Sequence, residues 1–163
     1  MKHRVLPTFG LAVVCLACAV PVLAQKLEGV PPKTGHATFT FASKDLTYDV
    51  VEGGFQQVEG FTTATLVFRP AVKPKANSHL NLTLMYQAPG KVDLAAPFSV
   101  NGIAMFGDGS VTRYTKGKSQ CTITLTKATP TEVEGTADCP LLHDISGEVA
   151  APLTNVKFSA TTK

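Results

Sequence analysis

Residues 120–139 read QCTITLTKATPTEVEGTADC, and this stretch decides the fold. Its two halves, 120–126 and 133–139, alternate apolar and polar residues and are rich in Thr and Val, which predicts two β-strands. The connection between them contains Pro130, a residue that favours turns and cannot continue a central strand. We therefore expect an antiparallel hairpin centred on Pro130.

One register of this hairpin places Cys121 directly opposite Cys139 and separates an apolar face from a polar face, as a half-buried antiparallel pair requires. A Cys-x-x-Cys redox motif is absent, and zinc would need further ligands at matching spacing. The sequence therefore predicts a structural disulfide between Cys121 and Cys139. The same register pairs Ile123 with Ala137, Leu125 with Gly135, Thr122 with Asp138 and Thr124 with Thr136.

The N-terminus has the pattern of a bacterial signal peptide. Lys2 and Arg4 form a basic region, residues 11–20 are almost entirely apolar, and Ala24 precedes Gln25 at a small-residue cleavage site. The apolar run is shorter than the roughly 20 residues that span a bilayer. We expect residues 1–24 to be removed between Ala24 and Gln25, without a membrane span.

Cys18 offers an alternative to simple cleavage. It follows Leu16 and Ala17, which resembles the end of a lipobox, the motif whose cysteine receives a lipid anchor in bacterial lipoproteins. Cys15 occupies the position where Leu is usual, so the match is partial. Cleavage at Ala24 is the favoured interpretation, and lipidation of Cys18 is the alternative.

The charge of the chain gives little support for a polyanionic partner. The 163 residues contain 15 Lys and Arg against 12 Asp and Glu, a formal net charge of +3. Lys2 and Arg4 would leave with the signal segment, so the 139 remaining residues carry only +1. A nearly neutral domain has no long-range field to attract nucleic acid, and we expect no nucleic-acid partner.

The rest of the chain reads as short strands separated by turn residues. Residues 25–35, with Gly29, Pro31, Pro32 and Gly35, read as a flexible N-terminal arm, and 36–163 as one domain. Roughly eight to ten strands at this spacing indicate an all-β fold, an antiparallel β-sandwich, with a closed β-barrel as the alternative. The expected strands are 36–42, 46–50 (ended by Gly53 and Gly54), 61–69, 79–86, 98–106, 111–116, 120–126, 133–139, 145–150 and 155–161.

The C-terminal part resembles a group of small exported proteins. Residues 121–126, 133–139 and 155–160 form a Cys-led strand, a Gly-Thr return strand and a Phe-containing final strand. This pattern is similar to that of small, uncharacterised exported bacterial β-sandwich proteins of lipoprotein-like type. The resemblance implies a periplasmic or secreted location and no particular activity.

The densest cluster of chemically versatile side chains is Asp138, His143 and Asp144. Two carboxylates and an imidazole within seven residues could bind a metal or transfer protons. Their spacing matches no metal-ligand pattern, so a polar turn after the disulfide is the simpler interpretation. The sequence predicts no catalytic residue, cofactor or metal, and a metal-dependent hydrolase is only a remote alternative.

Two functions remain as hypotheses. The first is an exported, non-enzymatic binding or structural protein of the bacterial cell envelope, whose unknown partner would contact loops 70–78, 88–97 and 140–153. The second is a carrier of a small apolar ligand in the cavity of a β-barrel. The cavity would be lined by Phe39, Phe41, Phe61, Phe68, Leu82, Leu84, Phe98 and Phe106.

Overall fold

Residues 29–72, 78–94, 100–107 and 110–163 are described by the computed structural model, which forms twelve β-strands in these ranges. The expected signal segment, including Ala24, Gln25 and the lipidation candidate Cys18, lies outside the described residues. Within them, no helix is long and apolar enough to cross a membrane.

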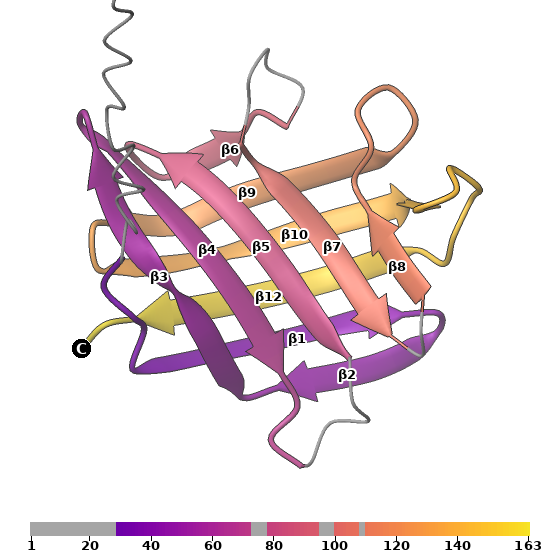
Figure 1. Ribbon diagram of the computed structural model, residues 1–163, viewed down its shortest axis with the longest axis horizontal. Coiled ribbons are helices and arrows are strands. Elements are labelled where there is room, and N and C mark those ends of the chain that lie inside the picture. The colour runs from indigo at the N-terminus through magenta and orange to yellow at the C-terminus, as the bar shows by residue number, and fades with distance from the viewer. Residues whose placement is uncertain (1–28, 73–77, 95–99, 108–109) are drawn as a thin grey trace, which may run out of the picture.

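The strands form two six-stranded antiparallel sheets, which lie face to face with their strands crossing obliquely (Figure 1). Sheet I has the order β2 (Lys44–Tyr48), β1 (Thr34–Phe41), β12 (Leu153–Thr161), β10 (Glu132–Leu141), β9 (Gln120–Thr129) and β6 (Gly90–Val92). Sheet II has the order β11 (His143–Asp144), β8 (Ser110–Arg113), β7 (Gly102–Gly107), β5 (His79–Tyr86), β4 (Phe61–Arg69) and β3 (Val50–Val58). The predicted β-sandwich is confirmed, and the described residues do not form a closed barrel.

The β9–β10 hairpin has the predicted register in its central part. Thr122 to Leu125 pair with Asp138 to Gly135, and Cys121 and Cys139 form a disulfide with their Cα atoms 4.1 Å apart. The strands are longer than expected, because β9 continues to Thr129 and only Pro130 and Thr131 form the turn. Such a tight turn would place Cys121 opposite Pro140, one residue away from Cys139. The extra residue Thr126, a β-bulge, corrects the register by one.

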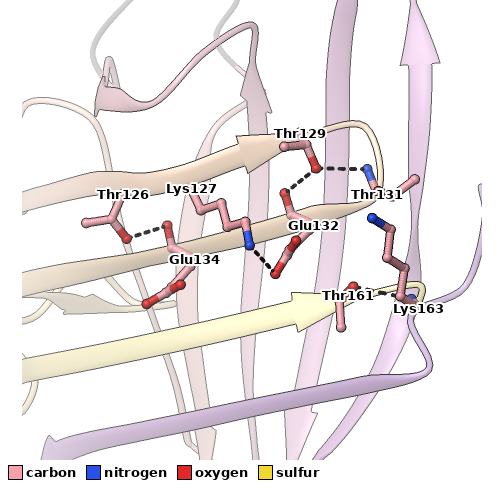
Figure 2. A network of polar contacts seen from close by, with 8 residues as sticks. All are labelled: Thr126, Lys127, Thr129, Thr131, Glu132, Glu134, Thr161 and Lys163. Atoms are coloured by element: carbon pink, nitrogen blue, oxygen red, sulfur yellow. Dashed lines mark hydrogen bonds and ion pairs between the residues drawn. The ribbon is translucent and has the colours of Figure 1, made fainter.

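Polar contacts hold the turn and the bulge of this hairpin on its outer face (Figure 2). The Thr126 hydroxyl donates to the Glu134 carbonyl at 3.2 Å, and the Thr129 hydroxyl donates to the Glu132 carbonyl at 3.3 Å. Lys127 forms an ion pair with Glu132 at 2.8 Å, and this hydrogen bond raises the pKa of Lys127. These short-range contacts support the tight turn and the register that it sets.

The sequence predicts that Gly53 and Gly54 end a strand, and this prediction is wrong. Both residues lie inside β3. Asp49 alone separates β2 in sheet I from β3 in sheet II, so the chain bends from one sheet into the other at this corner. Gly53 has a φ of +112°, and a Cβ atom there would lie 1.9 Å from the Thr65 carbonyl oxygen on β4. Glycine is needed at this position for close backbone approach within the sheet.

The strand expected at residues 145–150 is wrong over 145–147, which form a turn, whereas Val149 pairs with His143 in an isolated antiparallel β-bridge. The Asp144 Oδ1 atom accepts hydrogen bonds from the backbone N–H groups of Ser146 at 2.8 Å and Glu148 at 3.1 Å. Gly147 has a φ of +88° and donates its N–H to the Asp144 carbonyl at 3.1 Å. An aspartate side chain that captures nearby backbone N–H groups competes with strand pairing.

The inner faces of the sheets pack together in one apolar core. Phe39, Phe68, Leu82 and Leu84, four of the residues expected to line a barrel cavity, are between 0% and 3% exposed and belong to this core. Alternating residues of each strand therefore fill the space between the sheets. This filling contradicts the interpretation of these four side chains as the walls of a ligand cavity.

The described part of the expected N-terminal arm has backbone partners. Val30 and Phe55 exchange two backbone hydrogen bonds of 2.7 and 2.9 Å, and the Lys33 N–H donates to the Thr161 carbonyl at 2.8 Å. The segment therefore joins the edge strand β3 of sheet II to the end of β12 in sheet I before β1 begins. Residues 25–28 lie outside the described range.

Replacing both cysteines by Ala (Cys121→Ala with Cys139→Ala) is expected to lower the free energy of unfolding by about 3 kcal/mol, because the disulfide closes a loop of roughly 19 residues. Urea unfolding of the oxidised protein and the variant would measure the difference. A reducing agent should destabilise the parent and leave the variant unchanged. Equal stability of the oxidised and reduced parent would contradict the prediction.

The substitution Gly53→Ala is expected to lower the free energy of unfolding by about 3 kcal/mol, since the new methyl group would meet the Thr65 carbonyl in an unfavourable backbone conformation. Gly102→Ala is the matched control, because a Cβ atom at Gly102 has nothing within 4 Å. Thermal unfolding followed by circular dichroism would compare them. Similar midpoints for both variants would show that the close approach at Gly53 is unimportant.

Candidate functional site

A cavity of about 630 Å³ is lined by residues that include Ala42 in the β1–β2 turn and Ser110 at the start of β8. These two segments lie at the lower right of Figure 1. We call this cavity the end pocket. Both sheets and three connecting segments contribute to its walls. It is lined by Phe41, Ala42, Lys44, Leu46, Tyr48, Pro70, Val72, Ser78, Met105, Gly107, Ser110, Thr112, Asp144, Ala150 and Ala151.

The β1–β2 hairpin forms one side of the end pocket. Its two turn residues, Ala42 and Ser43, have positive φ angles of 50° and 61°. A two-residue turn with both residues in the left-handed conformation matches the twist of the flanking strands. Gly and Asn are the residues that usually adopt this conformation, whereas here Ala and Ser do. The turn places the half-buried Phe41 and Leu46, together with the exposed Lys44, along the same wall.

The deepest residues of the end pocket are buried and hydrogen bonded. The Tyr48 hydroxyl lies 2.5 Å from the Ser78 hydroxyl, and the Tyr48 ring meets Phe39 edge-on with centroids 5.0 Å apart. The Thr112 hydroxyl donates to the Met105 carbonyl at 3.2 Å. Because these polar atoms have protein partners, the inner part of the pocket offers mainly an apolar surface to a ligand.

Two charged residues of opposite sign line the end pocket. The Asp144 Oδ1 atom accepts three hydrogen bonds, the shortest from the Ser146 hydroxyl at 2.6 Å. The Ser146 hydroxyl, followed by backbone N–H groups, lowers the pKa of Asp144, so the carboxylate remains ionised to lower pH. Lys44 forms no side-chain hydrogen bond or ion pair within the described part of the chain.

The most exposed large apolar residues lie at or beside this pocket. Val72 is 86% exposed and lines the pocket directly. Ile145 and Val149 are 71% and 70% exposed and adjoin the lining residues Asp144 and Ala150 in sequence. Single exposed apolar residues are ordinary on protein surfaces, and of these three Val72 is the one that lines the pocket itself.

Two other surface depressions among the described residues are smaller. One of about 430 Å³ is lined by Gly29, Pro31, Gly53, Gly54, Gln56, Thr63 and Thr65 beside the β3 edge. Another of about 340 Å³ lies beside Tyr114 and Cys121. The end pocket is therefore the best candidate for a ligand site among these depressions.

The residues proposed as a remote metal or catalytic cluster point to different environments. Asp138 is exposed on β10, whereas His143 is only 7% exposed and its Nδ1 atom lies 3.1 Å from the Ser119 hydroxyl. Asp144 is engaged by its own turn. Within the described ranges, no group of three His, Cys, Asp or Glu side chains could hold a metal ion.

The end pocket contains one residue of the expected barrel lining, Phe41. Phe61 is 38% exposed, Phe106 stacks on His79 with ring centroids 4.1 Å apart, and Phe98 lies outside the described residues. Of the loops expected to make contacts, 70–78 and 140–153 contribute Pro70, Val72, Ser78, Asp144, Ala150 and Ala151. No pattern in the sequence predicted that Lys44 and Leu46 would line the same cavity as these loops.

Comparisons with known proteins identify no family for this chain. No family model matches it, and no curated protein matches it. One solved structure that is similar is that of the S-type phycobiliprotein lyase CPES from Guillardia theta. The match has 11% sequence identity and a TM-score of 0.39, and it covers 78% of this chain and 84% of that chain. At this TM-score the match carries no conclusion about function.

The hydrogen bond from the Ser146 hydroxyl to Asp144 makes the stability of this turn depend on pH in the acidic range. Its folded-state pKa lies below the ordinary value of 3.8, so the turn contributes stability above pH 3.8 that is lost as the pH falls through the lower folded value. Ser146→Ala is expected to raise the Asp144 pKa toward 3.8, measured by NMR titration of the carboxyl group. Ser110→Ala, which leaves the turn intact, serves as the control. An unchanged Asp144 pKa in Ser146→Ala would contradict the assigned cause.

Proposed function

We propose that this chain is an exported, non-enzymatic bacterial binding protein that holds a small, largely apolar ligand in the end pocket. The observation that carries the proposal is the cavity itself, about 630 Å³ in volume and lined by apolar side chains together with several polar ones. Pockets that bind small molecules usually measure about 300–1,000 Å³ and combine an apolar wall with a few polar groups. The end pocket meets both criteria.

The frame around the pocket favours a preformed binding site. Phe41, Leu46 and Tyr48 lie on paired strands of sheet I, while Met105 and Thr112 lie on paired strands of sheet II. Side chains on paired strands are held more rigidly than side chains on loops, so less conformational entropy is lost when a ligand binds.

The chemistry of the lining supports binding rather than catalysis. The lining residues include no His or Cys, and the Tyr48, Ser78 and Thr112 hydroxyls are hydrogen bonded within the protein. The buried Ser119–His143 pair lies outside this lining, and the Ser119 hydroxyl also accepts the Thr115 N–H at 3.1 Å. A nucleophile would need an activating base beside it, and the carboxylate among the described lining residues, Asp144, has its Oδ1 atom bound by its own turn.

The proposed location rests on the N-terminal sequence and the cysteines. Residues 1–24 have the pattern of a cleavable export signal, and disulfides persist mainly in oxidising compartments such as the periplasm. The Cys121–Cys139 disulfide in the structure is compatible with that location. We therefore place the proposed carrier in the periplasm or outside the cell.

The exported protein is expected to bind the apolar dye N-phenyl-1-naphthylamine with saturable fluorescence enhancement. Ala151→Trp should weaken this binding roughly tenfold or more, because the indole fills part of the pocket. The matched control is Ala88→Trp, at an exposed position in the turn between β5 and β6. Circular dichroism would verify that both variants are folded.

Equal dye affinity in the two tryptophan variants would refute binding in the end pocket. Failure of the folded parent to bind the dye at all would refute the proposed apolar-ligand function itself. The comparison does not depend on stability, because each variant is tested well below its unfolding temperature.

A further inference from the structure

We infer that the ligand of the end pocket is an amphiphile with an anionic head group, which binds beside Lys44 while its apolar tail occupies the pocket. This inference rests on the proposed function and extends it to a ligand class. The inference is based on the two charged residues at the pocket wall, Lys44 and Asp144. Binding of a purely apolar ligand would not require a charge at this position.

Lys44 supplies the available positive charge. It lines the end pocket, its side chain is exposed, and it has no side-chain partner among the described residues. The neighbouring carboxylate of Asp45 already accepts a hydrogen bond from the Thr40 hydroxyl at 2.7 Å. The ammonium group of Lys44 therefore keeps all three of its hydrogen-bond donors for a ligand.

Asp144 is the charge that would favour the opposite choice, a cationic head group. Its Oδ1 atom is the acceptor for the Ser146 hydroxyl and for the backbone N–H groups of Ser146 and Glu148. These donors engage the Oδ1 atom of the carboxylate, which stays ionised, and hold it in the turn. Because Asp144 is hydrogen bonded and Lys44 is not, the unmet interaction at the pocket wall favours an anion.

The apolar part of the lining suits a hydrocarbon tail rather than a compact polar molecule. Phe41, Leu46 and Met105 form apolar walls, and Val72 extends this surface into solvent. A tail would gain free energy by leaving water for these walls, while a head group near Lys44 would remain hydrated. A long-chain carboxylate combines both properties.

The test measures displacement of N-phenyl-1-naphthylamine from the exported protein by three probes with the same tail: dodecanoate, dodecan-1-ol and dodecyltrimethylammonium. Each probe is used below its micelle concentration. We expect dodecanoate to bind most tightly. Lys44→Gln should weaken dodecanoate about threefold to fivefold, the upper part of the range for an exposed ion pair, and leave dodecan-1-ol unchanged.

Lys157→Gln is the matched control, because Lys157 is an exposed lysine on β12 that does not line the end pocket. It should leave all three affinities unchanged, and added salt should reduce the preference for dodecanoate only while Lys44 is present. An unchanged dodecanoate affinity in Lys44→Gln, or tightest binding of the cationic probe, would overturn the anionic head group while leaving the apolar pocket intact. Absence of binding by the dye and all three probes would overturn both proposals.

Discussion

Mutual burial of the two inner sheet faces is the constraint on which the rest of this protein depends. Leu66, Leu82 and Leu84 of sheet II and Ile123 and Val156 of sheet I are almost completely removed from water. Neither sheet could keep such a face exposed, so each requires the other as its cover. A single-residue slip in any strand would turn its apolar side chains outward. The bulge at Thr126 and the Cys121–Cys139 disulfide fix the register of the β9–β10 hairpin.

The end pocket follows from how this burial is completed at the edges. The chain passes from sheet I to sheet II through Asp49, which closes one corner of the sandwich. At the edge of sheet II, β11 has two residues, and the segment that follows it contributes Ala150 and Ala151 to the pocket wall. The end of the core is therefore lined by apolar residues and remains open. Because side chains fill the centre of the fold, this opening is the place that we propose for a ligand.

Polar groups at the opening divide into those satisfied by the protein and those left for a partner. Tyr48 is hydrogen bonded to Ser78, and Asp144 is bound by its own turn. Lys44 has no such partner among the described residues. This difference, rather than the number of charges, supports a ligand with an apolar body and one anionic group. The His143 side chain, which drew attention in the sequence, instead contributes a buried hydrogen bond to the fold.

The sequence by itself determined the all-β class and the register of the disulfide hairpin, because alternation and cysteine spacing act between residues close in the chain. It misread Gly53 as a strand end, since the reason for that glycine is the Thr65 carbonyl on a neighbouring strand. It also missed the end pocket, apart from Phe41 and two of its loops. Lys44 and Asp144 are one hundred residues apart in sequence and meet at one cavity only when the sheets pack. Tertiary structure decided the site because long-range packing brings its walls together.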